Sequence, residues 1–285
     1  MNEEEKINES TDDGPQSTEN INTVSEPSII NEQPSIENME VHKHPHHVTH
    51  KKKWGEYLLE FFMLFLAVFL GFVAENIREH QIEKNREKEY IQSLIADLES
   101  DQQVLSQHIL HVNTGITMMD SVIMILNTPL QIGGNTGHLY YLARLAPRLN
   151  PLSTNSRTFE QLKNSGNFRL IRNLSTSDKI MSYYEKFTLI HLLESVNETE
   201  FTEYKKVAAK IFDPAVFLKM EGINDEIKRT SENPPLRITD NELLQELSIF
   251  AVYLHGTKKG ILGADEQLKN VGAVLIKYLQ KEYEF

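Results

Sequence analysis

The stretch Tyr57–Ile77 reads YLLEFFMLFLAVFLGFVAENI, and the interpretation of the whole chain starts from it. No charged or strongly polar residue occurs between Phe61 and Ala74. About 20 apolar residues in a helix span the ~30 Å hydrocarbon core of a bilayer. Each central Leu, Phe or Val favours insertion by roughly 0.3–0.6 kcal/mol, so the run as a whole favours lipid. We therefore predict one transmembrane helix over residues 54–77.

Two other interpretations of this stretch are weaker. A buried core helix of a soluble protein would usually show a polar face, which this run lacks. A cleaved signal peptide would lie nearer the start of the chain, and Val73-Ala74-Glu75 is a poor cleavage site. Glu60 opposes insertion, but it lies in the first turn of the span, where its carboxylate can reach the headgroup layer. We interpret the stretch as an uncleaved signal anchor that places the chain in a lipid bilayer.

The residues that flank the span indicate its orientation. Lys51, Lys52 and Lys53 directly precede it, whereas the basic residues that follow it are interleaved with glutamates. Loops rich in Lys and Arg stay on the cytoplasmic side. We expect a single-pass protein with a cytoplasmic N-terminus and an extracytoplasmic C-terminal domain, which would be periplasmic in a bacterium with two membranes.

Residues 1–50 differ in composition from the rest of the chain. Residues 1–53 hold eleven acidic residues against five lysines and are rich in Glu, Asn, Ser and Pro. Such a segment cannot bury enough apolar area to offset its chain entropy, so we expect a disordered acidic tail. The tail ends in the His/Lys-rich tract HKHPHHVTHKKK, whose five histidines could chelate Zn, Ni or Cu. We interpret this tract as solvated and predict no metal site, because no rigid scaffold fixes ligand geometry.

Small residues share one face of the predicted span. Ala67, Gly71 and Ala74 are spaced by four and three residues. Ala67 and Gly71 form a small-xxx-small pair, which lets a second helix approach closely. This face is a candidate for self-association, although small residues are common in any span.

Two long apolar patterns follow the span. Apolar residues recur at alternating steps of four and three from Ile91 to Leu126 and again from Leu243 to Tyr278, with Gln102 and Thr257 as the polar members. Such heptad patterns are typical of helix bundles and coiled coils.

The simplest fold that buries both patterns is all-α. We expect a disordered tail, one transmembrane helix and a long-helix bundle domain over residues 78–285, because amphipathic faces are usually buried within one domain. The alternative is a parallel coiled coil between chains, formed by residues 78–127.

Helix ends are predicted from Pro, Gly and capping residues. Thr128-Pro129 and Gly133-Gly134-Asn135 end the first pattern, and a short helix and a loop follow it, at residues 138–145 and 146–155. A helix with Ser156 as its cap opens next and turns at Gly166-Asn167 into a second short helix.

The second half of the chain is divided in the same way. Ser175 or Ser177 caps a long helix that ends near Ile211, with an inner side marked by Ile180, Tyr184, Phe187, His191 and either Leu192 or Val196. Residues 214–237 are expected to be irregular. Thr239 or Asp240 caps the last helix, which Gly256, Gly260 and Gly263 could break.

Three segments of the chain together resemble a known family. These are WGEYLLEFFMLFLAVFLGFVAENIREH, then EKNREKEYIQSLIADLESD, and TFEQLKNSGNFRLIRN with Tyr183-Tyr184 downstream. They are similar to blocks of an uncharacterised family of bacterial single-span envelope (inner-membrane) proteins. The resemblance covers roughly a quarter of the chain and implies a membrane anchor and a helical domain. It implies no activity, no cofactor and no catalytic residue.

The residues show no signature of a known chemistry. The chain has no cysteine, which excludes disulfides and thiol catalysis, and it contains no phosphate-binding glycine loop, HExxH or nucleophile elbow. Its net charge is −12 and no segment forms a basic footprint, so we expect no nucleic-acid partner. We predict no catalytic residue and no cofactor.

Several charged residues are candidates for a binding site. Arg157, Arg169 and Arg172 surround the Gly166 turn and could gather an anion or a partner carboxylate, although surface arginines are common. We expect His108 and His111 to be exposed, and the acidic residues Asp97, Glu99 and Asp101 to form a solvated face.

Three functions remain open at this stage. The first hypothesis is a membrane-anchored interaction or scaffold protein whose partners are other envelope proteins or a second copy. The alternative is a sensory or ligand-binding module that signals through the span. An enzyme with a dispersed site ranks last.

Overall fold

The structure is a computed structural model that describes residues 53–285. The prediction for the tail at residues 1–50 and its histidine tract lies outside the described residues. The described part is all-α, as predicted, and its one β feature is the isolated bridge between Glu221 and Ile227. The α-helices are α1 (Trp54–Leu126), α2 (Pro129–Leu145), α3 (Arg157–Asn164), α4 (Leu174–Glu185), α5 (Phe187–Ile211), α6 (Pro214–Lys219) and α7 (Asn241–Tyr283), with short 3-10 helices η1 (Asn167–Leu170) and η2 (Ile223–Asp225).

The predicted span forms the first part of α1. Among the described residues, α1 alone contains a window long and apolar enough to cross a membrane, and none of that window is buried. Every residue from 54 to 77 is exposed, and Phe72 keeps 74% of its surface accessible. Burial begins only at the bundle, where Ile91 and Leu94 are fully enclosed.

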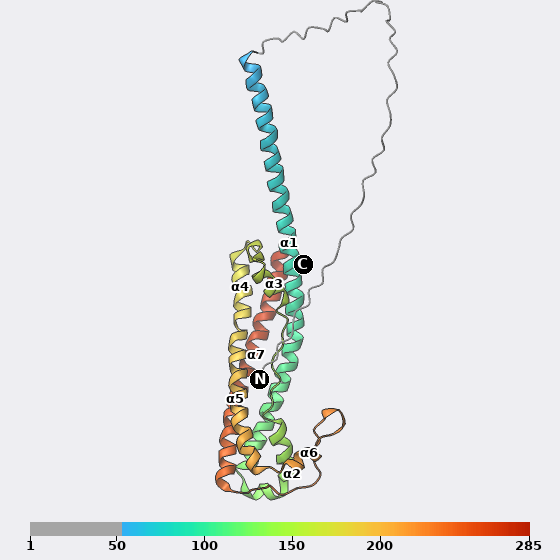
Figure 1. Ribbon diagram of the computed structural model, residues 1–285, viewed down its shortest axis with the longest axis vertical. Helices are drawn as coiled ribbons and strands as arrows, with labels where there is room; N and C mark the ends of the chain where they lie inside the picture. The colour runs from blue at the N-terminus through green and yellow to red at the C-terminus, as the bar shows by residue number, and fades with distance from the viewer. Residues whose placement is uncertain (1–52) are drawn as a thin grey trace, which may run out of the picture. The chain divides into compact units, whose positions relative to one another are not determined.

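Three long helices form the frame of the bundle (Figure 1). α7 runs antiparallel to α1, because Glu87 contacts Tyr283 at one end of the pair and Asn127 contacts Ser248 at the other. α5 packs along α7, where the side chain of Leu193 lies against Gly260. The two apolar patterns of the sequence are therefore buried within one chain, which confirms the prediction of a helical bundle.

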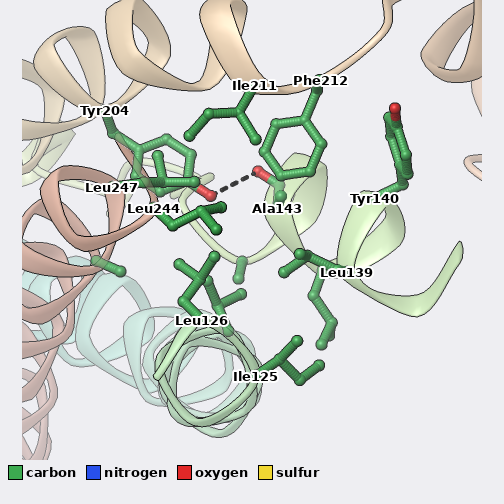
Figure 2. Packing of buried hydrophobic residues seen from close by; sticks show 14 of the residues in the cluster. Ile125, Leu126, Leu139, Tyr140, Ala143, Tyr204, Ile211, Phe212, Leu244 and Leu247 are labelled. Atoms are coloured by element: carbon green, nitrogen blue, oxygen red, sulfur yellow. Dashed lines mark hydrogen bonds between the residues drawn. The ribbon is translucent and has the colours of Figure 1, made fainter. Parts of the chain in front are cut away.

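Two apolar clusters fill most of the interior. The cluster nearer the span joins α1 to α4 and α7 through residues such as Leu98, Tyr183 and Leu275. The cluster at the far end joins α1, α2, α5 and α7 (Figure 2). In this second cluster, the hydroxyl of Tyr204 donates to the main-chain oxygen of Ala143 across 3.4 Å.

Most helix ends lie where the sequence predicts them. α1 ends at Leu126, the segment 146–155 is free of regular structure, and Gly166 adopts the left-handed conformation with φ 68°. Asp240 caps α7, because its carboxylate accepts from the amides of Glu242 and Leu243.

Four predictions about the helices were wrong. α2 begins at Pro129 rather than near His138, and the Gly-Gly-Asn run only kinks it at Asn135. The cap of α4 is Asn173, whose side chain accepts from two amides, rather than a serine. α6 forms within the segment expected to be irregular, with Pro214 at its start. α7 continues without a break through its glycines, because its packing offsets their low helix propensity.

For the long helix that ends at Ile211, the prediction of which residues face inward was also wrong in the second half of the helix. Lys186 separates α4 from α5, but the buried side continues across it at steps of three and four through Ile180, Tyr183, Phe187 and Ile190, so His191 is exposed rather than buried. Phe187 is buried as predicted, but Leu192 and Val196 are exposed, and Ile190 and Asn197 point inward instead.

Candidate functional site

An extended segment, residues 146–156, connects α2 to α3 and lies along the bundle. We call it the strap. Side chains of α1, α5 and α7 bind its main chain in order, from Lys258 at Arg148 to Asp101 at Asn155. Successive partners on α1 run from His108 back to Asp97, so the strap is antiparallel to α1. It takes the place that a further long helix would occupy in a four-helix bundle.

Two buried carboxylates of α1 hold the end of the strap next to α3. Asp97 accepts from the side-chain amide of Asn155 at 2.6 Å and from the main-chain amide of Thr158 at 3.0 Å. Asp101 accepts from the main-chain amide of Asn155 at 2.7 Å and from the hydroxyl of Tyr183 at 3.4 Å. Burial raises the pKa of Asp101 to about 6, although these hydrogen bonds oppose the shift.

His108 and Asp265 form a buried pair beneath the middle of the strap. Nδ1 of His108 lies 2.8 Å from a carboxylate oxygen of Asp265, and Nε2 donates to the main-chain oxygen of Asn150 at 2.8 Å. Because a carbonyl only accepts, Nε2 carries a proton. Burial works against the charged ring, but the hydrogen bond and charge of Asp265 outweigh it and raise the pKa of His108.

Two further side chains complete the set. Lys258 of α7 is fully buried, and its Nζ donates to the main-chain oxygen of Arg148 at 2.8 Å. Burial lowers the pKa of Lys258 to about 8. Glu194 of α5 accepts from the amide of Leu152 at 2.6 Å. We call the six residues of this set the polar ladder: Asp97, Asp101, His108, Glu194, Lys258 and Asp265.

The polar ladder positions the chain rather than offering a reactive group to solvent. Its hydrogen bonds go to groups of the strap, to Thr158, Tyr183 and His191 on the neighbouring helices, or to one another, and its members are buried apart from part of Glu194. Within residues 53–285 no group of three His, Asp or Glu side chains is arranged to hold a metal ion. The arrangement satisfies buried main-chain donors and acceptors that would otherwise destabilise the fold.

The sequence missed these residues. Asp97, Asp101 and His108 were predicted to be solvated, yet each is at most 6% exposed. The signal was present in the spacing, because Lys258 and Asp265 lie seven residues apart and keep step with Leu254, Ile261 and Leu268. The buried face of α7 is rotated toward these positions, whereas Thr257 and Ala264 of the predicted pattern lie at its edge.

The predicted arginine cluster is divided among separate contacts. Arg172 binds Glu83 at 2.7 Å. Arg157 is exposed and lies 3.8 Å from Asp97, at a groove that Arg86 also lines. Arg169 is exposed on η1.

The small-residue face of the span is open in this single chain. Ala67, Gly71 and Ala74 are exposed, and apart from the helix itself no described residue lies within 4 Å of the position that a Cβ atom would take on Gly71.

Comparisons of this chain with protein-family models, with curated proteins and with solved structures find no match. The chain is an all-α protein in which one candidate membrane helix continues into a bundle closed by an extended strap.

Replacement of Asp97 by Ala tests the ladder. The variant leaves the donors on Asn155 and Thr158 without their acceptor, so we expect the free energy of unfolding to fall by about 2–4 kcal/mol. Thermal unfolding of the full chain in a neutral detergent, followed by circular dichroism, measures it. Glu99→Ala, at an exposed position of the same helix, is the control and should change stability by less than about 0.5 kcal/mol. Equal effects of the two substitutions would contradict the role of Asp97.

Lys258 makes stability depend on pH. Its pKa is about 8 in the folded chain and 10.5 without burial, so the unfolded chain binds more protons between these values. Lys258 should therefore add a rise of about 2 kcal/mol to the free energy of unfolding between pH 8 and 10, against the opposite contribution of buried tyrosines such as Tyr183 and Tyr204, whose pKa burial raises. Lys258→Met should remove this rise, and Lys259→Met, at the exposed next position, should keep it. The test is to measure unfolding midpoints against pH for the original chain and the two variants. Parallel curves for all three would show that Lys258 does not cause the rise.

Proposed function

We propose that this chain is a single-pass, membrane-anchored interaction protein. Its helical bundle presents a surface to other envelope proteins or to a second copy of the chain. The observation that carries the proposal is an apolar stripe on α5, formed by Leu189, Leu192 and Val196, whose side chains are 50%, 60% and 38% exposed.

The stripe is more than scattered surface leucines. Its members are spaced by three and four residues, so they lie on one face of α5. On the adjoining helix, Ile249, Val252 and Tyr253 are also exposed. Apolar side chains that share one helix face in this way are a candidate site of protein association, whereas single exposed apolar residues are not.

The construction of the domain suits a scaffold. α1 passes without a break from the apolar segment into the bundle, and the polar ladder fixes the strap against it. A partner bound on α5 would therefore be held at a defined distance from the bilayer. The sidedness of the proposal follows from Lys51–Lys53 before the span, which favour a cytoplasmic N-terminus.

Labelling of introduced cysteines tests the sidedness, because the chain has no cysteine of its own. We expect a membrane-impermeant maleimide to modify Lys281→Cys in intact cells or spheroplasts. Ser10→Cys should be modified only after the membrane is permeabilised. The reverse pattern would place the bundle in the cytoplasm.

Photo-crosslinking in living cells tests the surface. A photoreactive amino acid at Leu192 or Val196 should give discrete adducts, and Leu189→Asp should reduce them, because a charge on the stripe opposes its burial. The control position is Glu198, which is exposed on the opposite side of α5.

The size of the adduct identifies the partner class. Self-association would give an adduct of twice the 32.9 kDa chain, and a different mass would indicate another protein. An absence of adducts at Leu192 and Val196, or equal adducts at Glu198, would contradict the proposal.

A further inference from the structure

A cavity of about 410 Å³ lies at the end of the bundle away from the span. It is bounded by the end of α2, the second half of α5, α6 and the segment at Arg237. Its size falls within the range of about 300–1,000 Å³ that is usual for small-molecule sites. The hydroxyl of Tyr140 ties the start of α6 to the segment before α7, because it accepts from the amide of Asp213 and donates to the main-chain oxygen of Pro235, both at 3.0 Å.

Four cationic residues line this cavity: Arg144, Arg148, Lys205 and Arg237. Two of them are held in place. Arg144 donates to the main-chain oxygen of Phe217 and to Glu221, and its guanidinium lies 5.6 Å from the ring centre of Phe217. The Nζ atom of Lys205 lies 4.3 Å from the ring centre of Phe201 and 3.5 Å from Glu198.

The other two cations lack a carboxylate partner. Arg148 and Arg237 are exposed, and within residues 53–285 no carboxylate oxygen lies within 4 Å of either guanidinium. The main chain at both residues is fixed, since Lys258 binds the oxygen of Arg148 and the amide of Arg237 donates to Ile211 at 2.9 Å. The cavity thus holds four cations against the two carboxylates that contact them.

The remainder of the lining is aromatic and apolar. Phe201, Tyr204, Phe212 and Phe217 contribute rings. Tyr204 and Phe212 also belong to the apolar cluster beneath the cavity, where both are almost fully buried (Figure 2). An apolar body is therefore complementary to the interior, and a negative charge is complementary to the guanidinium groups.

We propose that this cavity binds a small organic anion, with a carboxylate or phosphate group on an aromatic or short aliphatic body. Lipids also combine an anionic group with an apolar body, but the position of the cavity favours a water-soluble ligand. Leu126, at the end of α1 near the cavity, is 49 residues beyond Ile77, which corresponds to about 74 Å along a helix. Lipids of the anchoring bilayer lie at the other end of that helix.

This site is separate from the proposed partner surface. On α5, Phe201 and Lys205 lie on the side opposite to Leu192 and Val196 by helical spacing. The two proposals are therefore independent, and their experiments test different faces of the same helix.

Binding measurements on the full chain in nanodiscs of neutral phosphatidylcholine test the proposal. The probes are 4-phenylbutyrate, phenyl phosphate and the uncharged 4-phenylbutanamide, studied by ligand-detected NMR and isothermal titration calorimetry, with empty nanodiscs as the blank. At least one anion should bind saturably at a single site, and the amide should bind at least about tenfold more weakly, because it lacks the charge that the arginines recognise. Equal binding of acid and amide, or no binding of either anion, would overturn the proposal.

Variants locate the site. Arg148→Gln combined with Arg237→Gln should weaken anion binding by about tenfold or more, and both positions are exposed, so the fold should be kept. Ala209→Trp, at an exposed lining position, should fill the cavity and abolish binding. Arg169→Gln removes an exposed arginine at the other end of the bundle and should leave binding unchanged.

Two results would refute this assignment. Undiminished binding in the double variant would show that the anion binds elsewhere. Tighter binding of dihexanoyl phosphatidic acid, a soluble lipid probe, than of both organic anions would replace the small-molecule ligand by a lipid headgroup.

Discussion

The bundle depends on hydrogen bonds that side chains make to the main chain of one segment. A strap without regular structure lies along three helices, and between Leu149 and Asn155 its amides and carbonyls make no hydrogen bond to the main chain of the described residues. An unpaired buried donor or acceptor costs roughly 1–3 kcal/mol. Side chains from α1, α5 and α7 supply the missing partners, and each of these helices is thereby tied to the strap.

The polar ladder also connects the two ends of the domain. The strap passes the cationic cavity at Arg148 and leads into α3, where Asp97 binds Thr158 and α3 lies close to the segment of α1 that leaves the bundle. Apolar clusters lie at both ends and account for most of the burial, whereas the ladder specifies how the strap is placed between them. Buried charges of this kind contribute more to a unique arrangement than to net stability, since their desolvation offsets much of their attraction.

Much of the fold could be predicted from local chemistry. The end of α1 before Thr128-Pro129, the loop at 146–155, the left-handed turn at Gly166 and the Asp240 cap follow from proline, glycine and capping rules. The heptad patterns correctly indicated long helices that pack within the chain. The anchor, its sidedness and the family resemblance remain predictions.

The candidate sites were less accessible to sequence reasoning. A heptad pattern assigns apolar residues to the inside, so Asp101 and His108 were placed in solvent and Lys258 was not recognised, although all three keep the spacing of the buried face. Their partners lie in a loop 42 to 110 residues away in the sequence, and no local rule places that loop against them. The cavity is equally non-local, because its cations come from α2, the strap, α5 and the segment before α7.

Hydrogen exchange of single amides in the strap is the most direct test of this account. In the full chain, held in detergent, the amides of Leu152, Asn155 and Thr158 donate to Glu194, Asp101 and Asp97. We expect them to exchange several orders of magnitude more slowly than unstructured amides, and much more slowly than the amide of exposed Ser153. Exchange of all four amides at the rate of an unstructured chain would show that the strap is not bound to the bundle, and would contradict the central claim.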